Sequence, residues 1–273
     1  MAEKLVRDEG LALPIDVLRL AHSRDIHVEA KPADAGGVSG MLIRVGESYS
    51  IAYATHIRSE GFQRFSIAHE LGHYFLDGHP EAVFRTGTVH ESHAGFEGDD
   101  QIELEADHFA AGLLMPSHLF EAAASRFDDG MDAVKGLADV CKTSLTAAAI
   151  RYAQLGAPAI AIILSRGSTV DFCFASEAMR RSRGYRHQKK GSILPRNSVT
   201  RDFNLDHQNV LLGRDSSDST ELNVWFHTDD EIDASEEVLG LGEYGRTLTV
   251  ITAEIPDLDD ESEDRSWKSP GFR

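Results

Sequence analysis

The chain has 273 residues, of which 41% are hydrophobic and 26% are charged, so it can bury the core of one large domain or of two small ones. Its formal net charge of −18 argues against non-specific binding to nucleic acid and suits a basic protein partner. The longest apolar stretch, residues 155–164, is too short to cross a bilayer, and residues 1–20 lack the core of a signal peptide. Cys141 and Cys173 are too few for a disulfide framework. These features predict a cytoplasmic protein with no membrane segment and no direct contact with nucleic acid.

The first elements along the chain are predicted to be a helix and a hairpin. Residues 14–23 suit a helix, because Pro14 is acceptable in a first helical turn. Residues 39–45 and 49–54 alternate apolar and polar side chains on either side of a Gly-Glu-Ser turn. This second pattern predicts two antiparallel strands.

An H-E-x-x-H motif follows, His69-Glu70-Leu71-Gly72-His73, inside a helical apolar stretch from Phe65 to Leu76. One turn of helix separates the two histidines, so both imidazoles leave the same face and can share one Zn²⁺. Glu70 lies next to the first ligand, where it can act as a general base toward a water on the metal. The alternative is a pair of core histidines beside a solvated Glu70. Gly78 is the expected end of this helix.

A second acidic helix is predicted downstream, over residues 102–115. Asp99 and Asp100 are candidate N-caps, and Pro116 is the expected stop. Its first turns read Glu103-Leu104-Glu105-Ala106-Asp107. A catalytic zinc with two histidine ligands needs a third protein ligand, which this helix can supply.

Helix geometry selects Glu103 as that ligand. Glu103 and Asp107 are four residues apart and share a face, so Glu103 can bind the metal while Asp107 accepts the free N–H of a ligand histidine. Glu105 lies about 200° around the helix from Glu103 and points elsewhere, and its own i+4 neighbour is Phe109, which cannot orient a histidine. The competing interpretation of Glu103 is a first-turn acid that complements the helix dipole.

A rival third ligand is His79, which follows His73 at the six-residue spacing of H-E-x-x-H-x-x-G-x-x-H. That motif needs glycine at position 76, where this chain has Leu76, and we therefore prefer Glu103. His90 and His93 lie in a polar stretch and are expected in a loop near the site.

Three segments resemble the ImmA/IrrE family of metallopeptidases. They are Gln63 to His73, Glu103 to Pro116 and, upstream, Ser39-Gly40-Met41-Leu42. The resemblance is good over roughly residues 10–155 and loose beyond them.

The resemblance implies roles for four residues: His69, His73 and Glu103 bind zinc, and Glu70 is the base. It also implies an intracellular protease that cleaves a helix-turn-helix repressor and so switches on stress or mobile-element genes. Zinc peptidases of this type often hold an extended substrate along a sheet edge. The hairpin at residues 39–54 is the candidate edge, with an ordinary core hairpin as the equal alternative.

Residues 131–155 are expected to form two short helices with a helix-turn-helix-like spacing, the second capped by Ser144. A DNA-reading helix needs several basic side chains, and residues 145–154 offer only Arg151. We therefore interpret the pair as a structural or protein-contact unit.

Beyond residue 156 the sequence predicts a separate sheet. The basic stretch 180–190 is expected to be a solvated loop, and residues 254–264 carry seven acids and no base, which is typical of a disordered tail. Strands are expected at residues 159–164, 169–175, 221–227 and 247–255.

The expected fold class is α+β, in four parts. They are a zincin-like metallopeptidase domain (1–120), a helix-turn-helix-like helical segment (121–156), a small α+β domain with an antiparallel sheet (157–255) and an acidic disordered tail (256–273).

The motif spacing predicts a gluzincin-like zinc endopeptidase, and the family resemblance implies that it acts on an XRE-like helix-turn-helix repressor in the cytoplasm. The alternative is a non-proteolytic, antitoxin-type protein that sequesters its partner. An intact Glu70 favours the enzyme, because a pure binder needs no positioned base.

Overall fold

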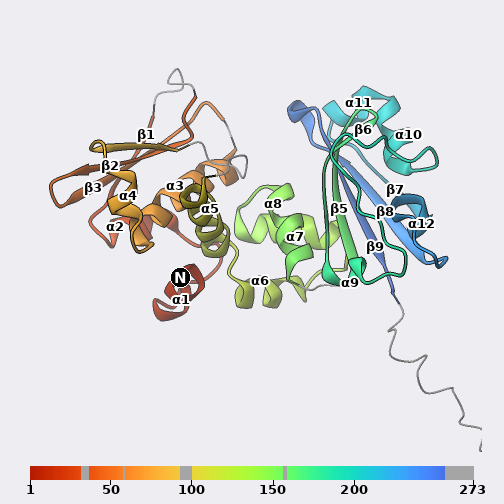
Figure 1. Ribbon diagram of the computed structural model, residues 1–273, viewed down its shortest axis with the longest axis horizontal. Coiled ribbons are helices and arrows are strands. Elements are labelled where there is room, and N and C mark those ends of the chain that lie inside the picture. Colours follow the sequence, from red (N-terminus) through yellow and green to blue (C-terminus); the bar gives the residue numbers. More distant parts are fainter. Residues whose placement is uncertain (32–36, 58, 93–99, 156–158, 256–273) are drawn as a thin grey trace, which may run out of the picture. The chain divides into compact units, whose positions relative to one another are not determined.

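The computed structural model describes residues 1–31, 37–57, 59–92, 100–155 and 159–255. The chain divides into two compact units, Met1–Leu155 and Gly156–Arg273 (Figure 1). Each unit combines helices with a sheet of its own, which confirms the α+β class. No helix in the described residues combines the length and the apolar composition that a membrane crossing requires.

The sheet of the first unit has four strands in the order β1-β3-β2-β4. The expected hairpin is present, as β2 (Gly40–Val45) and β3 (Ser48–Tyr53). Strand β1 (His27–Ala30) adds to β3 in parallel, and β4 (Val89–Ser92) adds to β2 in antiparallel orientation. Among the described strands the hairpin lies inside the sheet, so the candidate edge was wrong and the equal alternative, an ordinary core hairpin, is confirmed. The edges are β1 and β4, and β4 lies where a loop was expected.

Eight helices are described in the first unit. Helix α3 packs against β2 and β3 on one side and against α5 on another (Figure 1). The helices are α1 (Ala2–Asp8), α2 (Val17–His22), α3 (Glu60–Phe75), α4 (His79–Val83), α5 (Gln101–Leu114), α6 (Ser117–Ala124), α7 (Met131–Cys141) and α8 (Leu145–Gln154).

Capping residues explain where the two helices that carry the motifs begin. The Ser59 side chain accepts a hydrogen bond from the Phe62 N–H, so α3 starts one turn earlier than its apolar pattern indicates. Asp100 caps α5 in the expected way, through the Ile102 N–H. The other candidate cap, Asp99, lies outside the described residues.

The two short helices expected between residues 131 and 155 are present as α7 and α8, and the Ser144 hydroxyl caps α8. Their connection packs closely on α3. A Cβ added to Gly61 would lie 2.7 Å from the Ser144 backbone nitrogen, so only glycine fits at that position. These helices therefore belong to the same packed unit as α3.

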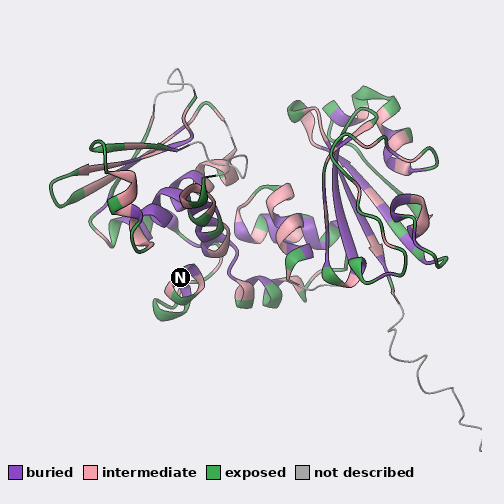
Figure 2. Ribbon diagram, in the orientation of Figure 1, coloured by how far each residue is buried: buried purple, intermediate pink, exposed green. Residues whose placement is uncertain are grey.

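The second unit is built on a five-stranded antiparallel sheet in the order β6-β5-β9-β8-β7. Both faces of its inner strands are covered, so nearly every residue of β5 and β9 is buried (Figure 2). The strands are β5 (Ala159–Arg166), β6 (Thr169–Ala175), β7 (Asp215–Glu221), β8 (Asp233–Gly240) and β9 (Thr247–Ala253).

Short helices cover this sheet. Helix α9 packs on β5, α10 and α11 pack on β8, and α12 packs on β7. The helices are α9 (Glu177–Arg180), α10 (Val199–Leu205), α11 (His207–Leu211), α12 (Leu222–Phe226) and the 3-10 turn η1 (Gly242–Tyr244).

One strand was predicted in the wrong place. Most of the predicted strand 221–227 forms helix α12 (Leu222–Phe226), because Leu222, Trp225 and Phe226 recur at helical spacing and all three are buried. The strand lies just before it, as β7, whose polar sequence is almost wholly exposed and carries no apolar signal. The expected tail, residues 256–273, lies outside the described residues.

Candidate metal centre

The two predicted motifs meet where α3 and α5 pack together. A Cβ added to Gly72 would lie 3.1 Å from the Ala106 Cα, so the glycine of the first motif allows the second helix to approach this closely. The approach brings Glu103 and Asp107 of α5 beside the two motif histidines of α3. Both histidines are almost fully buried, and Glu103 is partly exposed.

Three donor atoms converge at the centre of this packing. His69 Nε2 lies 3.0 Å from His73 Nε2 and 3.2 Å from Glu103 Oε2. His73 Nε2 lies 3.5 Å from the other oxygen, Glu103 Oε1. One ligand atom from each of the three residues lies within 4.8 Å of the others. The structure thus brings together the three residues that the sequence selected as ligands.

Asp107 holds the outer nitrogen of the first histidine. Its Oδ1 lies 2.7 Å from His69 Nδ1, and both side chains are buried. A carboxylate only accepts hydrogen bonds, so the ring proton of neutral His69 is on Nδ1 and the lone pair of Nε2 faces Glu103 and His73. The contact is the one expected for Asp107 from its position in the helix.

The residues considered as rival ligands lie on the far side of His73. His79 Nδ1 is 3.2 Å from His73 Nδ1, the nitrogen that faces away from His69. The other nitrogen of His79 is 3.2 Å from Glu105 Oε2. The sequence does not reveal this contact, because helix periodicity relates Glu105 only to the residues of its own helix.

His90 is a further neighbour of the centre. It comes from edge strand β4, and its Nε2 lies 3.0 Å from Glu103 Oε1. Its ring meets the His73 ring edge-on at a centroid distance of 4.6 Å. The position near the site was foreseen, but the strand that fixes it was not. His93 lies outside the described residues.

Burial and hydrogen bonds shift the pKa values of all three side chains of the centre. Burial lowers the pKa of His69, but hydrogen bonds with Asp107 and Glu103 outweigh it and raise that pKa to about 9. Burial and the charge of His69 lower the pKa of His73 to about 3. Burial of Glu103 is outweighed by its histidine contacts, which hold its pKa well below the usual range. Two imidazole nitrogens and a carboxylate oxygen are the donor set of catalytic zinc, so the residues fit this metal.

Glu70 is fully buried and, among the described residues, neither of its carboxylate oxygens has a hydrogen-bond partner. Burial raises the pKa of Glu70 to about 7, a rise that the charge of His69 opposes. Such a group changes protonation near neutral pH, which suits a general base or acid. An unpartnered buried carboxylate is costly, and its position beside a metal-type donor set points to a chemical role.

Two strands leave room for this carboxylate. A Cβ added to Gly40 of β2 would lie 2.4 Å from Glu70 Oε1, so any side chain there would displace the carboxylate. Gly40 pairs in register with Ser92 of β4, whose buried hydroxyl also lacks a partner among the described residues. The Ser-Gly segment noted in the sequence therefore lies against the Glu70 carboxylate.

Residues 21–152 match the family model described as Peptidase_M78, IrrE N-terminal-like domain. Residues 21–152 therefore resemble the ImmA/IrrE family. The matched region contains both helices of the candidate metal centre, and the family that it resembles is one of metallopeptidases. No curated protein matches the chain.

A solved structure described as a Mycobacterium tuberculosis transcriptional regulator is similar to the chain, with a TM-score of 0.57 and 14% sequence identity. The alignment covers 92% of this chain and 74% of that chain. At this identity the likeness shows a common fold.

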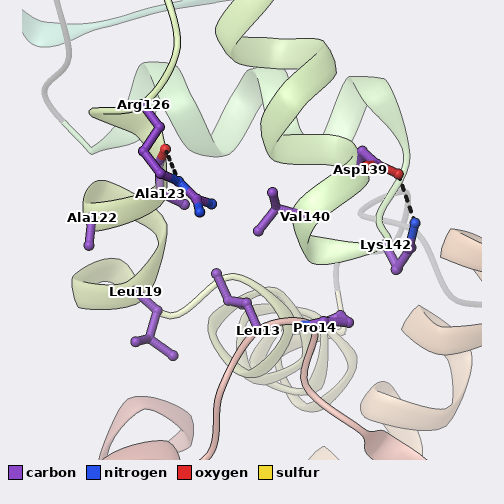
Figure 3. A pocket seen from close by; sticks show the side chains of 9 residues that line it. All are labelled: Leu13, Pro14, Leu119, Ala122, Ala123, Arg126, Asp139, Val140 and Lys142. Carbon is purple, nitrogen blue, oxygen red and sulfur yellow. Dashed lines mark hydrogen bonds and ion pairs between the residues drawn. The ribbon is translucent and has the colours of Figure 1, made fainter.

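A groove of about 520 Å³ opens elsewhere on the first unit, between the Leu13–Pro14 segment, α6 and α7 (Figure 3). None of the candidate metal ligands lines it. Its charged side chains are satisfied locally, since Lys142 pairs with Asp139 at 2.7 Å and Arg126 donates to the Ala123 carbonyl. We assign no chemistry to this groove.

Proposed function

We propose that the protein is a zinc-dependent endopeptidase that cleaves a helix-turn-helix repressor of the XRE type in the cytoplasm, and so derepresses stress or mobile-element genes. The observation that carries the proposal is the pairing of a three-donor centre with a buried, unpartnered Glu70 beside it. A protein that only binds a partner has no use for such a carboxylate, which costs stability.

His69, His73 and Glu103 are the residues that would hold the metal. Bound Zn²⁺ makes water a nucleophile near neutral pH and polarises a peptide carbonyl. Asp107 keeps the lone pair of His69 Nε2 directed at the centre. His90 holds one oxygen of the Glu103 carboxylate. The ligands are therefore fixed by contacts from both α5 and β4.

Glu70 is the proposed general base. It follows His69 in the helix, so its side chain leaves about 100° around the axis and does not compete for the same position. Its carboxylate accepts the proton of the attacking water and passes it to the leaving amine. A pKa raised to about 7 by burial matches both halves of this transfer.

Edge strand β4 is the proposed peptide-binding element. It pairs with β2 on one side and, among the described strands, with none on the other. A substrate segment that added to this free edge would extend the sheet, its main chain held by backbone hydrogen bonds. His90 comes from the same strand and touches Glu103, so a peptide on β4 would pass close to the metal centre.

The decisive experiment incubates wild type and Glu70→Gln with the helix-turn-helix repressor encoded beside the gene. We expect wild type with zinc to cut the repressor. Glu70→Gln should keep zinc and bind the repressor but cut at least a hundredfold more slowly, because an amide cannot accept the proton. Equal cutting by both proteins would remove Glu70 from the mechanism. Binding and derepression by both without cutting would establish the sequestering protein instead.

A further inference from the structure

A line of hydrogen-bonding side chains runs from the metal centre to the protein surface behind His73. His73 Nδ1 lies 3.2 Å from His79 Nδ1, and His79 Nε2 lies 3.2 Å from Glu105 Oε2. The second oxygen, Glu105 Oε1, accepts a hydrogen bond of 2.8 Å from the Gln101 side chain. The line begins at two buried rings and ends at an exposed carboxylate, so its charged end stays in contact with water.

The chemistry of the end group fixes the protons along the line. A carboxylate accepts hydrogen bonds, so the ring proton of neutral His79 lies on Nε2, facing Glu105. The Nδ1 of His79 then carries a lone pair and must accept from its neighbour. The donor is the Nδ1–H of His73, which leaves the lone pair on His73 Nε2, 3.0 Å from His69 Nε2. Glu105 thus selects, through His79, the tautomer of His73 that can bind a metal.

The local sequence explains how His79 reaches this position. Helix α3 ends at Phe75, and Gly78 adopts a left-handed conformation with φ of 81° before α4 begins. This conformation is easy for glycine and costly for other residues. The His79 N–H donates to the Leu76 carbonyl, so the chain folds back and the ring, only 3% exposed, lies against His73. The six-residue ligand motif requires its glycine at position 76, and this chain has its glycine at position 78 instead. This Gly78 directs His79 to the outer side of His73.

We propose that His79 and Glu105 are positioning residues for the metal ligand His73, equivalent in role to Asp107 on His69. The inference rests on the proposed metal centre and assigns each of its two histidines a separate support. It also gives functions to His79 and Glu105, the two residues that the sequence offers as alternatives to Glu103 for the third ligand. Neither binds the metal, and both act through His73.

The test measures zinc affinity of the full chain by competition with a chromophoric chelator. His79→Leu removes the acceptor and should weaken zinc binding about ten- to a hundredfold, the usual cost of losing such a support. His79→Asn places an amide oxygen near the position of His79 Nδ1, so it can still accept from His73 and should lose less than about tenfold. His22→Ala, an exposed histidine in α2, is the matched control and should bind zinc like wild type.

A double-variant cycle tests whether Glu105 acts through His79. Glu105→Leu alone should weaken zinc binding less than His79→Leu, and the double variant should equal His79→Leu. Independent losses that add would overturn the relay. The ring N–H signals of the Co²⁺-loaded protein give a second readout. Wild type should show two slowly exchanging ring N–H signals, one from His69 and one from His73. His79→Leu should keep the His69 signal and lose the His73 signal, a pattern that poor folding alone does not produce.

The outcomes distinguish a failure of this inference from a failure of the proposed function. If wild type binds zinc and His79→Leu binds it equally well with both N–H signals intact, the support of His73 by His79 is wrong and the metal centre stands. If wild type binds no divalent metal at all, the proposed function fails, and the positioning role fails with it.

Discussion

Gly40 and the Glu70 carboxylate occupy adjoining space in the first unit: a Cβ at position 40 would lie 2.4 Å from Glu70 Oε1. The contact joins strand β2 to helix α3 at a buried carboxylate next to the donor centre. The Ser39-Gly40 pair, which precedes the metal motif by about thirty residues, therefore belongs to the same site.

Gly40→Ala should therefore impair catalysis more than folding. The atom that must yield is the far end of the Glu70 side chain, so the backbone can stay in place while the carboxylate turns away. We expect the rate of repressor cleavage to fall at least tenfold, because the carboxylate no longer works efficiently as a general base. Zinc affinity should change less than about threefold. Gly87→Ala is the control, because a Cβ there meets nothing within 4 Å. An unimpaired Gly40→Ala enzyme would show that Glu70 does not work from this position.

Asp107→Ala should weaken zinc binding about ten- to a hundredfold, because His69 would lose the acceptor that fixes its tautomer. Asp107→Asn keeps an acceptor oxygen and should lose less. The control is Asp77→Ala, which removes an exposed acid just after α3, the helix that carries His69. Zinc titrations of the three variants provide the comparison, and equal affinities would reduce Asp107 to a core acid without influence on the metal.

His90→Ala should release one oxygen of Glu103 and weaken zinc binding by about tenfold, with a larger loss in cleavage if β4 holds the substrate. His90→Gln keeps an N–H donor and should recover most of the zinc affinity. Wild-type affinity in His90→Ala would mean that His73 and His69 alone orient the carboxylate. The variant then reports on substrate binding through its KM.

The donor centre could be predicted from the sequence because its spacings lie within single helices. His69 and His73 are separated by one turn, as are Glu103 and Asp107, and helix geometry alone then fixes which side chains share a face. His79 and Glu105 belong to different helices, and the contact between them depends on a left-handed Gly78 and on how closely α5 approaches α3. Periodicity carries no information of that kind.

The strands likewise fall into those that a local sequence pattern predicts and those that depend on tertiary contacts. Strands β5 and β9 have continuous apolar sequences and were predicted, whereas β7 reads Asp215 to Glu221 without one apolar residue. It forms because β8 offers a complete ladder of backbone partners, a tertiary effect that a local pattern does not contain. Strand β4 is only four residues long and was missed for the same reason.

In the second unit, Glu236 should be a major determinant of stability. It is fully buried, and it accepts hydrogen bonds from the Thr200 N–H and hydroxyl, both at 2.7 Å, and from the Trp225 indole at 3.0 Å. Glu236→Ala leaves the Thr200 N–H and the Trp225 indole N–H without this acceptor and should lower the free energy of unfolding by about 3 kcal/mol. Glu231→Ala, at an exposed position, should change it by less than about 0.5 kcal/mol. Urea denaturation of both variants checks the difference, and equal midpoints would contradict it.

Zinc affinity should rise with pH between about 7 and 9. Burial opposes protonation of His69, but its hydrogen bonds with Asp107 and Glu103 raise its pKa to about 9, so the metal-free protein carries a proton there at neutral pH. The pKa of His73 is lowered to about 3, so His73 carries none, and zinc displaces a single proton. Affinity should therefore increase about tenfold per pH unit until pH approaches 9.

The stability of the metal-free protein should change in the opposite direction over the same range. A folded pKa above the unfolded value contributes stability that is complete below about pH 6.5 and is lost as the pH rises through about 9. Thermal melts in chelator and zinc titrations at pH 6.5, 7.5 and 8.5 measure both trends. Asp107→Ala removes the main cause of the raised pKa, so its zinc affinity should depend less steeply on pH. A pH-independent wild-type affinity would mean that His69 is already neutral in the metal-free protein.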